Sequence, residues 1–254
     1  MRTIAVGNQK GGCGKTATAH ALGVALSESR RVLLVDMDPQ ASLSGACGLD
    51  DAAGASVAEV LGAAEPGKLA LADIIRPLGP TLALAPGDIA LAVSELGLVS
   101  RIGRESVLRR ALATVASDFD VAIIDCPPSL SVLTIAALAA ADGVILPTQP
   151  QASDLRGLGL FMDTLAKVRD AINPSLELIG VLVTFWDGRL LHHKAGLAAL
   201  QDAGLPLFVA KLGRSVRVAE AAGEAQTVLT YEPNNPRAAE TRALALEVAA
   251  WLAR

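Results

Sequence analysis

Aromatic residues are scarce in this 254-residue chain, at 3% of the sequence, although 52% of its residues are hydrophobic. The apolar content is mostly Ala, Leu and Val, so we expect an aliphatic core that is rich in helix. No apolar run reaches about 18 residues without a charge or a helix breaker, which argues against a membrane span. The sequence opens on an apolar strand pattern, so we also expect no signal peptide.

Cysteines are few as well. Cys13, Cys47 and Cys126 are an odd number and form no C-x-x-C pair, which favours reduced thiols in a cytosolic protein over a disulfide or zinc framework. We interpret all three as small residues that pack in the interior.

An excess of positive charge is absent too, because the formal net charge is −4. This balance predicts no global attraction to nucleic acid, but residues 185–217 depart from it. That segment has five basic residues and two acidic ones, which makes it a candidate local patch. The basic residues are Arg189, Lys194, Lys211, Arg214 and Arg217.

Near its start the chain has a glycine-rich turn between an apolar strand and a helix pattern. Successive glycines let backbone N–H groups turn inward on an anion, and the following helix adds its N-terminal amides. Lys15 is placed to reach the β- and γ-phosphates of a nucleotide, and the Thr16 hydroxyl to bind Mg²⁺. The predicted nucleotide-binding residues are Gly11, Gly12, Cys13, Gly14, Lys15, Thr16 and Ala17.

The loop departs from the strict G-x-x-x-x-G-K-[ST] pattern, because Gln9 stands where its first glycine belongs. The segment K-G-G-x-G-K-T instead resembles the deviant Walker A loop of the ParA/MinD family of ATPases. In that family the extra lysine, here Lys10, crosses the interface of an ATP-sandwich dimer to the partner's phosphates. Ala17 is a second departure, since many relatives have threonine there.

Two further apolar strands end in acidic residues. The strand at 31–35 runs into Asp36 and Asp38, and the strand at 119–125 ends in Asp125, at the sheet edge where open α/β sheets bind ligands. Standing alone, such residues could also cap helices or form polar turns. Their segments, D-x-D-P-Q and D-x-P-P-S, resemble switch I and the Walker B strand of the same family. The resemblance implies that Asp38 positions the attacking water, that Asp36 supports the metal-water shell, and that Asp125 holds Mg²⁺ through water.

The remaining pattern predicts an α/β fold of one domain over residues 1–254. Long apolar strands at 143–150 and 178–184 join the three already named, and helix patterns separate them. We expect a P-loop NTPase with a mostly parallel twisted sheet covered by helices on both faces. Shorter predicted elements are a helix at 56–61, strands at 72–75, 81–85 and 206–210, and helices at 89–99, 106–115, 153–171 and 237–254.

The segment beyond residue 184 carries the candidate DNA-binding residues. The adjacent histidines His192 and His193 point to different sides of a helix, so we interpret them as surface residues rather than a metal pair. Arg189 and Arg217 match family positions implicated in DNA binding, and Arg214 lies in the same loop. That loop, residues 211–217, begins with Lys-Leu-Gly-Arg, whereas relatives have Ile-Pro-Arg at this place. This departure leaves open whether the loop contacts adenine as it does in the family.

The resemblance to ParA-type partition ATPases covers nearly the whole chain and implies a nucleotide switch. ATP and Mg²⁺ would drive a homodimer that binds double-stranded DNA without sequence preference, weakly in high salt. Hydrolysis to ADP, stimulated by a ParB-like partner, would release the DNA. The implied location is cytoplasmic and nucleoid-associated, with no membrane contact expected.

Three alternatives stay open. A MinD-like membrane-positioning ATPase would need a terminal amphipathic helix with a basic polar face, whereas charges balance over residues 240–254. An iron–sulfur reductase ATPase would need two cysteines at a dimer axis, and Cys47 and Cys126 do not lie in such motifs. A ParA-like positioner of another cargo would share the biochemistry and differ in its partner.

Overall fold

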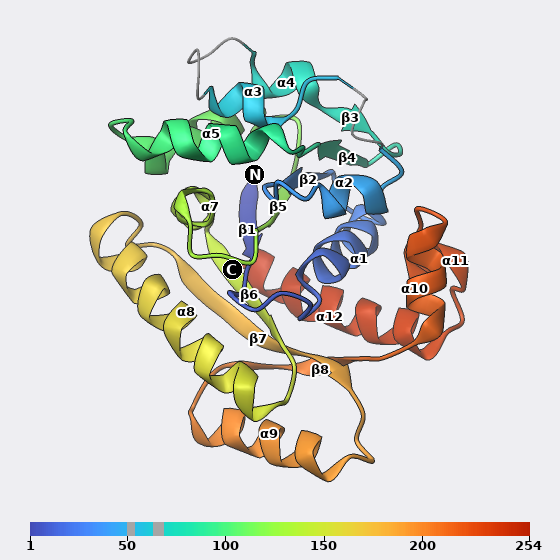
Figure 1. Cartoon of the computed structure of the whole chain (residues 1–254). Coiled ribbons are helices and arrows are strands. Elements are labelled where there is room, and N and C mark those ends of the chain that lie inside the picture. Colours follow the sequence, from blue (N-terminus) through green and yellow to red (C-terminus); the bar gives the residue numbers. More distant parts are fainter. Residues whose placement is uncertain (50–53, 63–68) are drawn as a thin grey trace.

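The fold is built on an eight-stranded sheet with strand order β3-β4-β2-β5-β1-β6-β7-β8 (Figure 1). The computed structural model describes residues 1–49, 54–62 and 69–254. All neighbouring strands in the sheet are parallel except β3 and β4, which are antiparallel. The strands are β1 (Arg2–Val6), β2 (Val32–Asp36), β3 (Arg76–Pro77), β4 (Leu82–Ala85), β5 (Val121–Asp125), β6 (Gly143–Thr148), β7 (Glu177–Trp186) and β8 (Leu207–Gly213).

Helices cover both faces of the sheet, because its central strands are apolar on both sides. Along β1, Ala5 packs into one buried cluster while Ile4 and Val6 pack into the other. The helices are α1 (Lys15–Ser27), α2 (Ser42–Ala46), α3 (Val57–Leu61), α4 (Leu71–Ile74), α5 (Ala90–Val99), α6 (Val107–Ala113), α7 (Val132–Ala140), α8 (Ala152–Ala171), α9 (Leu191–Asp202), α10 (Val216–Gly223), α11 (Val228–Tyr231) and α12 (Pro236–Leu252), with a 3-10 turn, η1, at Arg104–Ser106.

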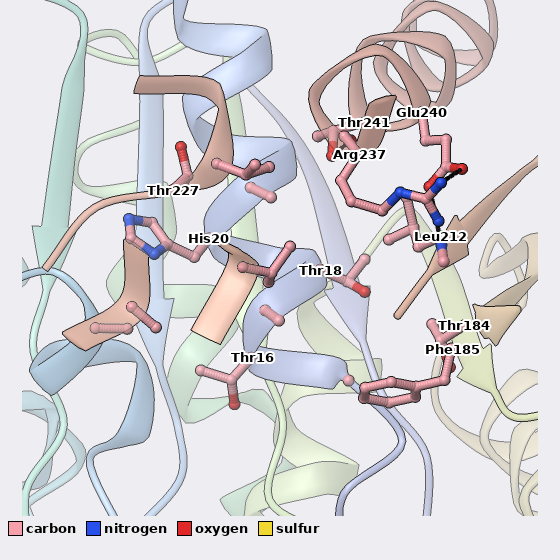
Figure 2. A pocket seen from close by; sticks show the side chains of 18 of the residues that line it. Thr16, Thr18, His20, Thr184, Phe185, Leu212, Thr227, Arg237, Glu240 and Thr241 are labelled. Carbon is pink, nitrogen blue, oxygen red and sulfur yellow. Dashed lines mark hydrogen bonds and ion pairs between the residues drawn. The ribbon is translucent and has the colours of Figure 1, made fainter. Parts of the chain in front are cut away.

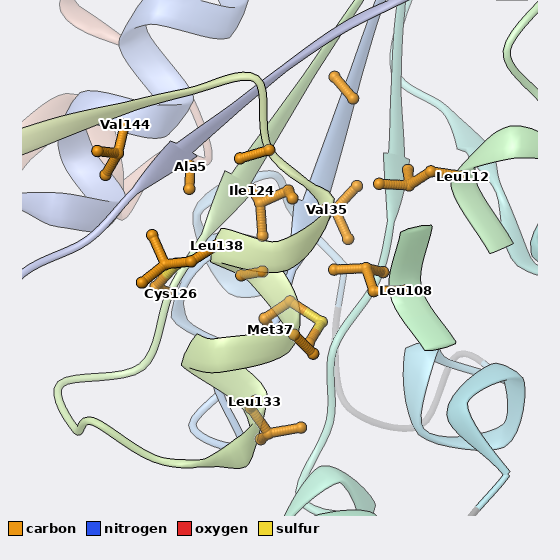
Figure 3. Close-up of a cluster of buried hydrophobic side chains, with 14 of the residues drawn as sticks. Ala5, Val35, Met37, Leu108, Leu112, Ile124, Cys126, Leu133, Leu138 and Val144 are labelled. Atoms are coloured by element: carbon orange, nitrogen blue, oxygen red, sulfur yellow. The ribbon is translucent and has the colours of Figure 1, made fainter. Parts of the chain in front are cut away.

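One face of the sheet packs against helices that include α6, α7 and α8. Figure 3 shows part of this core, in which Val35, Ile124 and Val144 meet Leu108 and Leu138. The other face packs against α1 and α12, with α10 and α11 beside them (Figure 1). The aliphatic core expected from the composition is confirmed, since Phe161 is the one aromatic among the largest fully buried side chains of the described residues.

Three predicted local structures were wrong. Residues 72–74 of the predicted strand at 72–75 belong instead to helix α4, and the Asp73 carboxylate accepts a hydrogen bond from the backbone N–H of Ala70. Such a bond closes the first turn of a helix. Strand β8 continues to Gly213, so the first three residues of the predicted 211–217 loop are strand. His193 is buried, as described below.

Helix α12 packs on the core, as its pattern indicated. Leu244, Val248 and Trp251 are buried, and the Trp251 indole donates to Glu177 at 2.8 Å. Among the described residues, no helix is both long and apolar enough to cross a bilayer.

Helix α9 lies against the end of β6 at a position that only glycine fits. A Cβ on Gly196 would lie 2.3 Å from the carbonyl oxygen of Pro150, a backbone atom that cannot rotate away. We therefore expect Gly196→Ala to lower the free energy of unfolding by about 1–3 kcal/mol through overpacking, measured by chemical denaturation.

The matched control is Gly159→Ala inside α8, where a Cβ would meet nothing within 4 Å. That change should raise stability by about 1 kcal/mol through helix propensity. Equal effects of the two changes would contradict the packing described here.

Candidate nucleotide site

The loop between β1 and α1 has the backbone of an anion cradle. Gly12 and Gly14 adopt φ values of +70° and +91°, a region that other residues rarely enter. A Cβ at Gly11 or Gly12 would meet nothing within 4 Å, so the loop borders open space. Gly14 is the N-cap of α1 and supplies no side-chain cap, which leaves the first amides of the helix available to a ligand.

Neighbouring strands hold this loop in place. Thr184 of β7 donates to the carbonyl of Cys13 at 2.8 Å, and the Gln149 amide after β6 donates to the carbonyl of Gly12 at 2.9 Å. Asn8 donates to the carbonyl of Pro147 at 2.7 Å and accepts from the backbone of Lys10 at 3.1 Å. Hydrogen bonds to segments far away in the sequence therefore fix the shape of the loop, so the loop is preorganised for a ligand.

The two lysines of the loop have different partners. The Lys15 ammonium donates to the carbonyl of Lys10 at 3.1 Å, so it lies within the loop. The Lys10 ammonium instead forms an ion pair with Asp154, a fully buried carboxylate in the first turn of α8. Asp154 also accepts from the backbone of Gln149 at 3.3 Å. The cradle thus holds one lysine, while the other is bound to a different element of the same chain.

Two buried carboxylates end adjacent strands of the sheet. Asp36 and Asp125 are register partners across β2 and β5, and both are fully buried. Asp36 accepts from the backbone of Asp38 at 3.1 Å and from the backbone and hydroxyl of Ser44, both at 2.8 Å. Burial, opposed by these bonds, raises the pKa of Asp36 to about 6.

Asp125 has fewer hydrogen-bond partners than Asp36. Neither of its carboxylate oxygens has a hydrogen-bond partner. Burial and then the charge of Asp36 raise its pKa well above the usual value, while the nearby Thr16 hydroxyl and then the charge of Lys15 act in the opposite direction. A buried carboxylate without a partner is costly unless a cation or proton joins it, so this position fits a cation.

The side chains available here fit Mg²⁺ that a nucleotide brings with it. Among the described residues, no group of three or more His, Cys, Asp or Glu side chains could hold a metal alone. Mg²⁺ commonly takes one or two carboxylates and fills its other positions with water and phosphate oxygens. Asp38 lies two residues beyond Asp36, is buried, and accepts from the backbone of Gln40 at 2.9 Å.

The three arginines predicted to bind DNA differ in their partners. Arg189 pairs with Asp187 through two hydrogen bonds of 3.0 and 2.7 Å, and Arg217 pairs with Glu220 at 2.8 Å and Glu232 at 3.5 Å. Arg214 is exposed and forms no ion pair with any residue that the structure describes. The local charge of Arg189 and Arg217 is therefore largely neutralised, while that of Arg214 is not.

His193 corrects the prediction that both histidines of α9 are surface residues. Its ring is buried, stacks on Trp186 with centroids 5.9 Å apart, and accepts a hydrogen bond from the backbone of Asp187 at 3.0 Å. This residue shapes the turn that carries Arg189. His192 is exposed, as expected.

Sequence reasoning missed several residues that build the site. Asn8, Gln149 and Thr184 hold the loop, Ser44 holds Asp36, and Asp154 holds Lys10. Asn8, Gln149 and Thr184 lie at or just beyond the carboxyl ends of strands, a placement that could have identified them. Ser44 and Asp154 gave no such signal.

Together the parallel sheet, the glycine cradle at a helix start and the paired acidic strand ends define a P-loop nucleotide-binding protein. A family model described as AAA domain matches residues 1–178. The chain is 40% identical to the chromosome-partitioning ATPase Soj of Thermus thermophilus, over 98% of this chain and 96% of that protein. It is 36% identical to the sporulation initiation inhibitor protein Soj of Bacillus subtilis, over 98% of both.

A solved structure has the same fold. It is a Mycobacterium smegmatis protein described as cobyrinic acid a,c-diamide synthase with bound ADP and magnesium, with a TM-score of 0.86 and 38% identity, over 98% of this chain and 94% of that one. Given these likenesses, this chain belongs to the ParA/Soj family of partition ATPases.

A cavity of about 330 Å³ adjoins the loop and reaches His20 in α1 (Figure 2). Burial lowers the pKa of His20 to about 4, so the folded protein favours its neutral form. The unfolded chain takes up a proton near pH 6.5, so stability from this residue is present at pH 7 and is lost as pH falls toward 4.

We expect His20→Gln to remove this dependence. The difference in unfolding free energy between wild type and variant should change by about 3 kcal/mol between pH 7 and pH 4. Urea titrations at several pH values measure it, and a difference that is independent of pH would contradict the buried neutral histidine.

Proposed function

We propose that this chain is a ParA-type ATPase of DNA segregation. ATP binding closes a homodimer, the dimer binds double-stranded DNA without sequence preference, and hydrolysis stimulated by a ParB-like protein releases the DNA. The protein would then act in the cytoplasm on the nucleoid. Family membership supports the general class of partition ATPase.

The observation that carries this proposal is the separation of the two loop lysines. Lys15 lies in the cradle and suffices to contact the phosphates bound in its own chain. Lys10 is bound to Asp154 and has an exposed fraction of 35%, so a nucleotide-bound partner could reach it. We infer that Lys10 leaves Asp154 for the partner's phosphates when the dimer forms.

The acidic residues would bind Mg²⁺ and orient the attacking water. Thr16, Asp36 and Asp125 would hold the Mg²⁺ of a bound nucleotide, which neutralises charge on the β- and γ-phosphates. The hydrogen bonds from Ser44 fix the Asp36 carboxylate, and Asp125 supplies the unpartnered oxygens. Asp38 lies just beyond them and would orient the attacking water.

The DNA surface would combine weak contacts from two subunits. Arg189, Arg214 and Arg217 follow the ends of β7 and β8, so dimerisation can join two such sets into one surface. Because Arg189 and Arg217 are paired with carboxylates, we assign the larger electrostatic share to Arg214.

The alternatives receive less support from the same residues. The apolar side of α12 is buried against the core. A MinD-like anchor would instead need an exposed apolar face that can insert into a membrane surface. Burial raises the pKa of the Cys126 thiol, and it raises the pKa of the Cys47 thiol to about 12. Both shifts disfavour the thiolates of an iron–sulfur site. A different cargo for a ParA-like protein stays compatible with every residue described.

Changing Asp38 tests the catalytic assignment. Asp38→Ala should still bind ATP, lower turnover by about a hundredfold or more, and accumulate as a dimer, because orientation of the water is lost while phosphate binding remains. Light scattering with ATP and a phosphate-release assay measure both effects. Lys15→Ala is the control that should bind no nucleotide and form no dimer. Wild-type turnover in Asp38→Ala would remove Asp38 from the mechanism.

Changing Arg214 tests the DNA surface. Arg214→Ala should weaken binding of the ATP state to every duplex sequence and reduce the slope of log affinity against log salt by about 1 per lost phosphate contact. Arg169→Ala is the matched control, since Arg169 is an exposed arginine at the far end of α8. Equal effects of both changes would contradict a localised surface.

A further inference from the structure

Helix α5 and the turn beyond it carry a row of exposed apolar side chains, here called the α5 stripe. Its members are Ile89, Val93, Leu96, Val99 and Ile102, and each is between 57% and 99% exposed. The other side of α5, which includes Leu91 and Leu98, is buried in the core that it shares with α3 and α7 (Figure 1). Single exposed apolar residues are ordinary, whereas a contiguous row of them marks an interaction surface.

The stripe begins at the edge of the sheet that carries the nucleotide site. Gly87 lies two residues before Ile89, and a Cβ on it would lie 2.8 Å from the carbonyl oxygen of Asp36. The backbone N–H of Gly87 donates at 3.0 Å to the hydroxyl of Ser44, which in turn donates to the Asp36 carboxylate. The start of α5 is therefore fixed beside the buried carboxylates, and the stripe extends outward from them.

The chemistry of the stripe favours a second copy of this chain as its partner. A two-fold axis places the same surface on both subunits, so an apolar stripe would meet an apolar stripe, whereas a charged surface would meet its own charge. The buried centre of a homodimer interface is also mostly apolar. A membrane surface would instead favour basic residues beside the apolar ones, but residues 88–105 contain three acidic and two basic residues.

The size of the stripe fits part of a dimer interface. A Val, Leu or Ile side chain buries on the order of 100 Å² when it is fully covered, so five partly exposed ones offer on the order of 400 Å² per subunit. A standard stable interface takes about 800 Å² from each partner. The stripe alone is therefore too small to hold two copies together, and the remaining area must come from the adjoining nucleotide edge.

We propose that the α5 stripe is the apolar part of the interface between two ATP-bound copies of this chain. The proposal rests on the nucleotide-dependent homodimer proposed above. Contacts across the nucleotides, including that of Lys10, would set when the two copies join. Burial of the stripe would supply the apolar area that charged groups at the nucleotide edge do not offer.

Sedimentation velocity of the full chain with Mg²⁺ and the slowly hydrolysed analogue ATPγS tests this assignment. Leu96→Asp should raise the dissociation constant of the dimer tenfold or more, because the dimer would contain the added carboxylate twice in an apolar contact. Leu96→Met should dimerise like wild type, since it keeps an apolar side chain of similar volume. Both variants should bind ADP with wild-type affinity in calorimetry, which shows that each subunit is folded.

The matched control is Leu246→Asp, because Leu246 is 73% exposed and Leu96 is 75% exposed. Leu246 lies on α12, which packs on the opposite face of the sheet, so its change should leave the dimer intact. Unchanged dimer affinity in Leu96→Asp, or equal losses in Leu96→Asp and Leu246→Asp, would overturn the role of the stripe while the nucleotide-dependent dimer stands. Failure of wild type to dimerise with ATPγS would contradict the proposed switch itself.

A membrane occupant gives a different result in the same variants. Wild type would then co-sediment with vesicles of phosphatidylcholine and phosphatidylglycerol, Leu96→Asp would not, and the dimer affinity of the two would be equal. That combination would overturn the proposal. No binding of wild type to the vesicles, together with a weakened Leu96→Asp dimer, is the predicted result.

Discussion

Two buried carboxylates at the ends of adjacent strands are the constraint on which the site depends. Asp36 and Asp125 face the same sheet edge, and the charge of Asp36 raises the pKa of Asp125 in addition to the effect of burial. Three hydrogen bonds compensate Asp36, whereas the two carboxylate oxygens of Asp125 have no partner within hydrogen-bond distance. The fold keeps an unpartnered carboxyl group beside a loop whose backbone attracts anions. A phosphate together with a divalent cation satisfies both at once.

The two loop lysines also differ in how their charge is compensated. Lys15 lies inside the cradle, while the buried charge of Asp154 requires a cation and holds Lys10. Moving Lys10 to another subunit would break its ion pair with Asp154, so a contact at the proposed dimer interface would compete with a contact to α8.

The parts of the fold that local pattern determines could be predicted. Apolar strands ending in Asp36 and Asp125, the glycine loop and the buried face of α12 all followed from the order of residues. The segment 72–75 was misjudged, since four residues are too few for a pattern to distinguish a strand from a helical turn. His193 was misplaced because Trp186, on another element, buries it. The Lys10–Asp154 and Gly213–Arg237 contacts join distant segments, which no local pattern reveals.

The central claim is that nucleotide state controls a DNA-binding dimer. Its most direct test is binding of the unmodified chain to an arbitrary DNA duplex with ATP, with ADP and without nucleotide, at low and at moderate salt. Strong binding with ATP alone, falling steeply as salt rises, is the predicted result. Absence of DNA binding in all three states, while ATP-dependent dimers still form, would contradict the account and favour a protein scaffold or a membrane as the target.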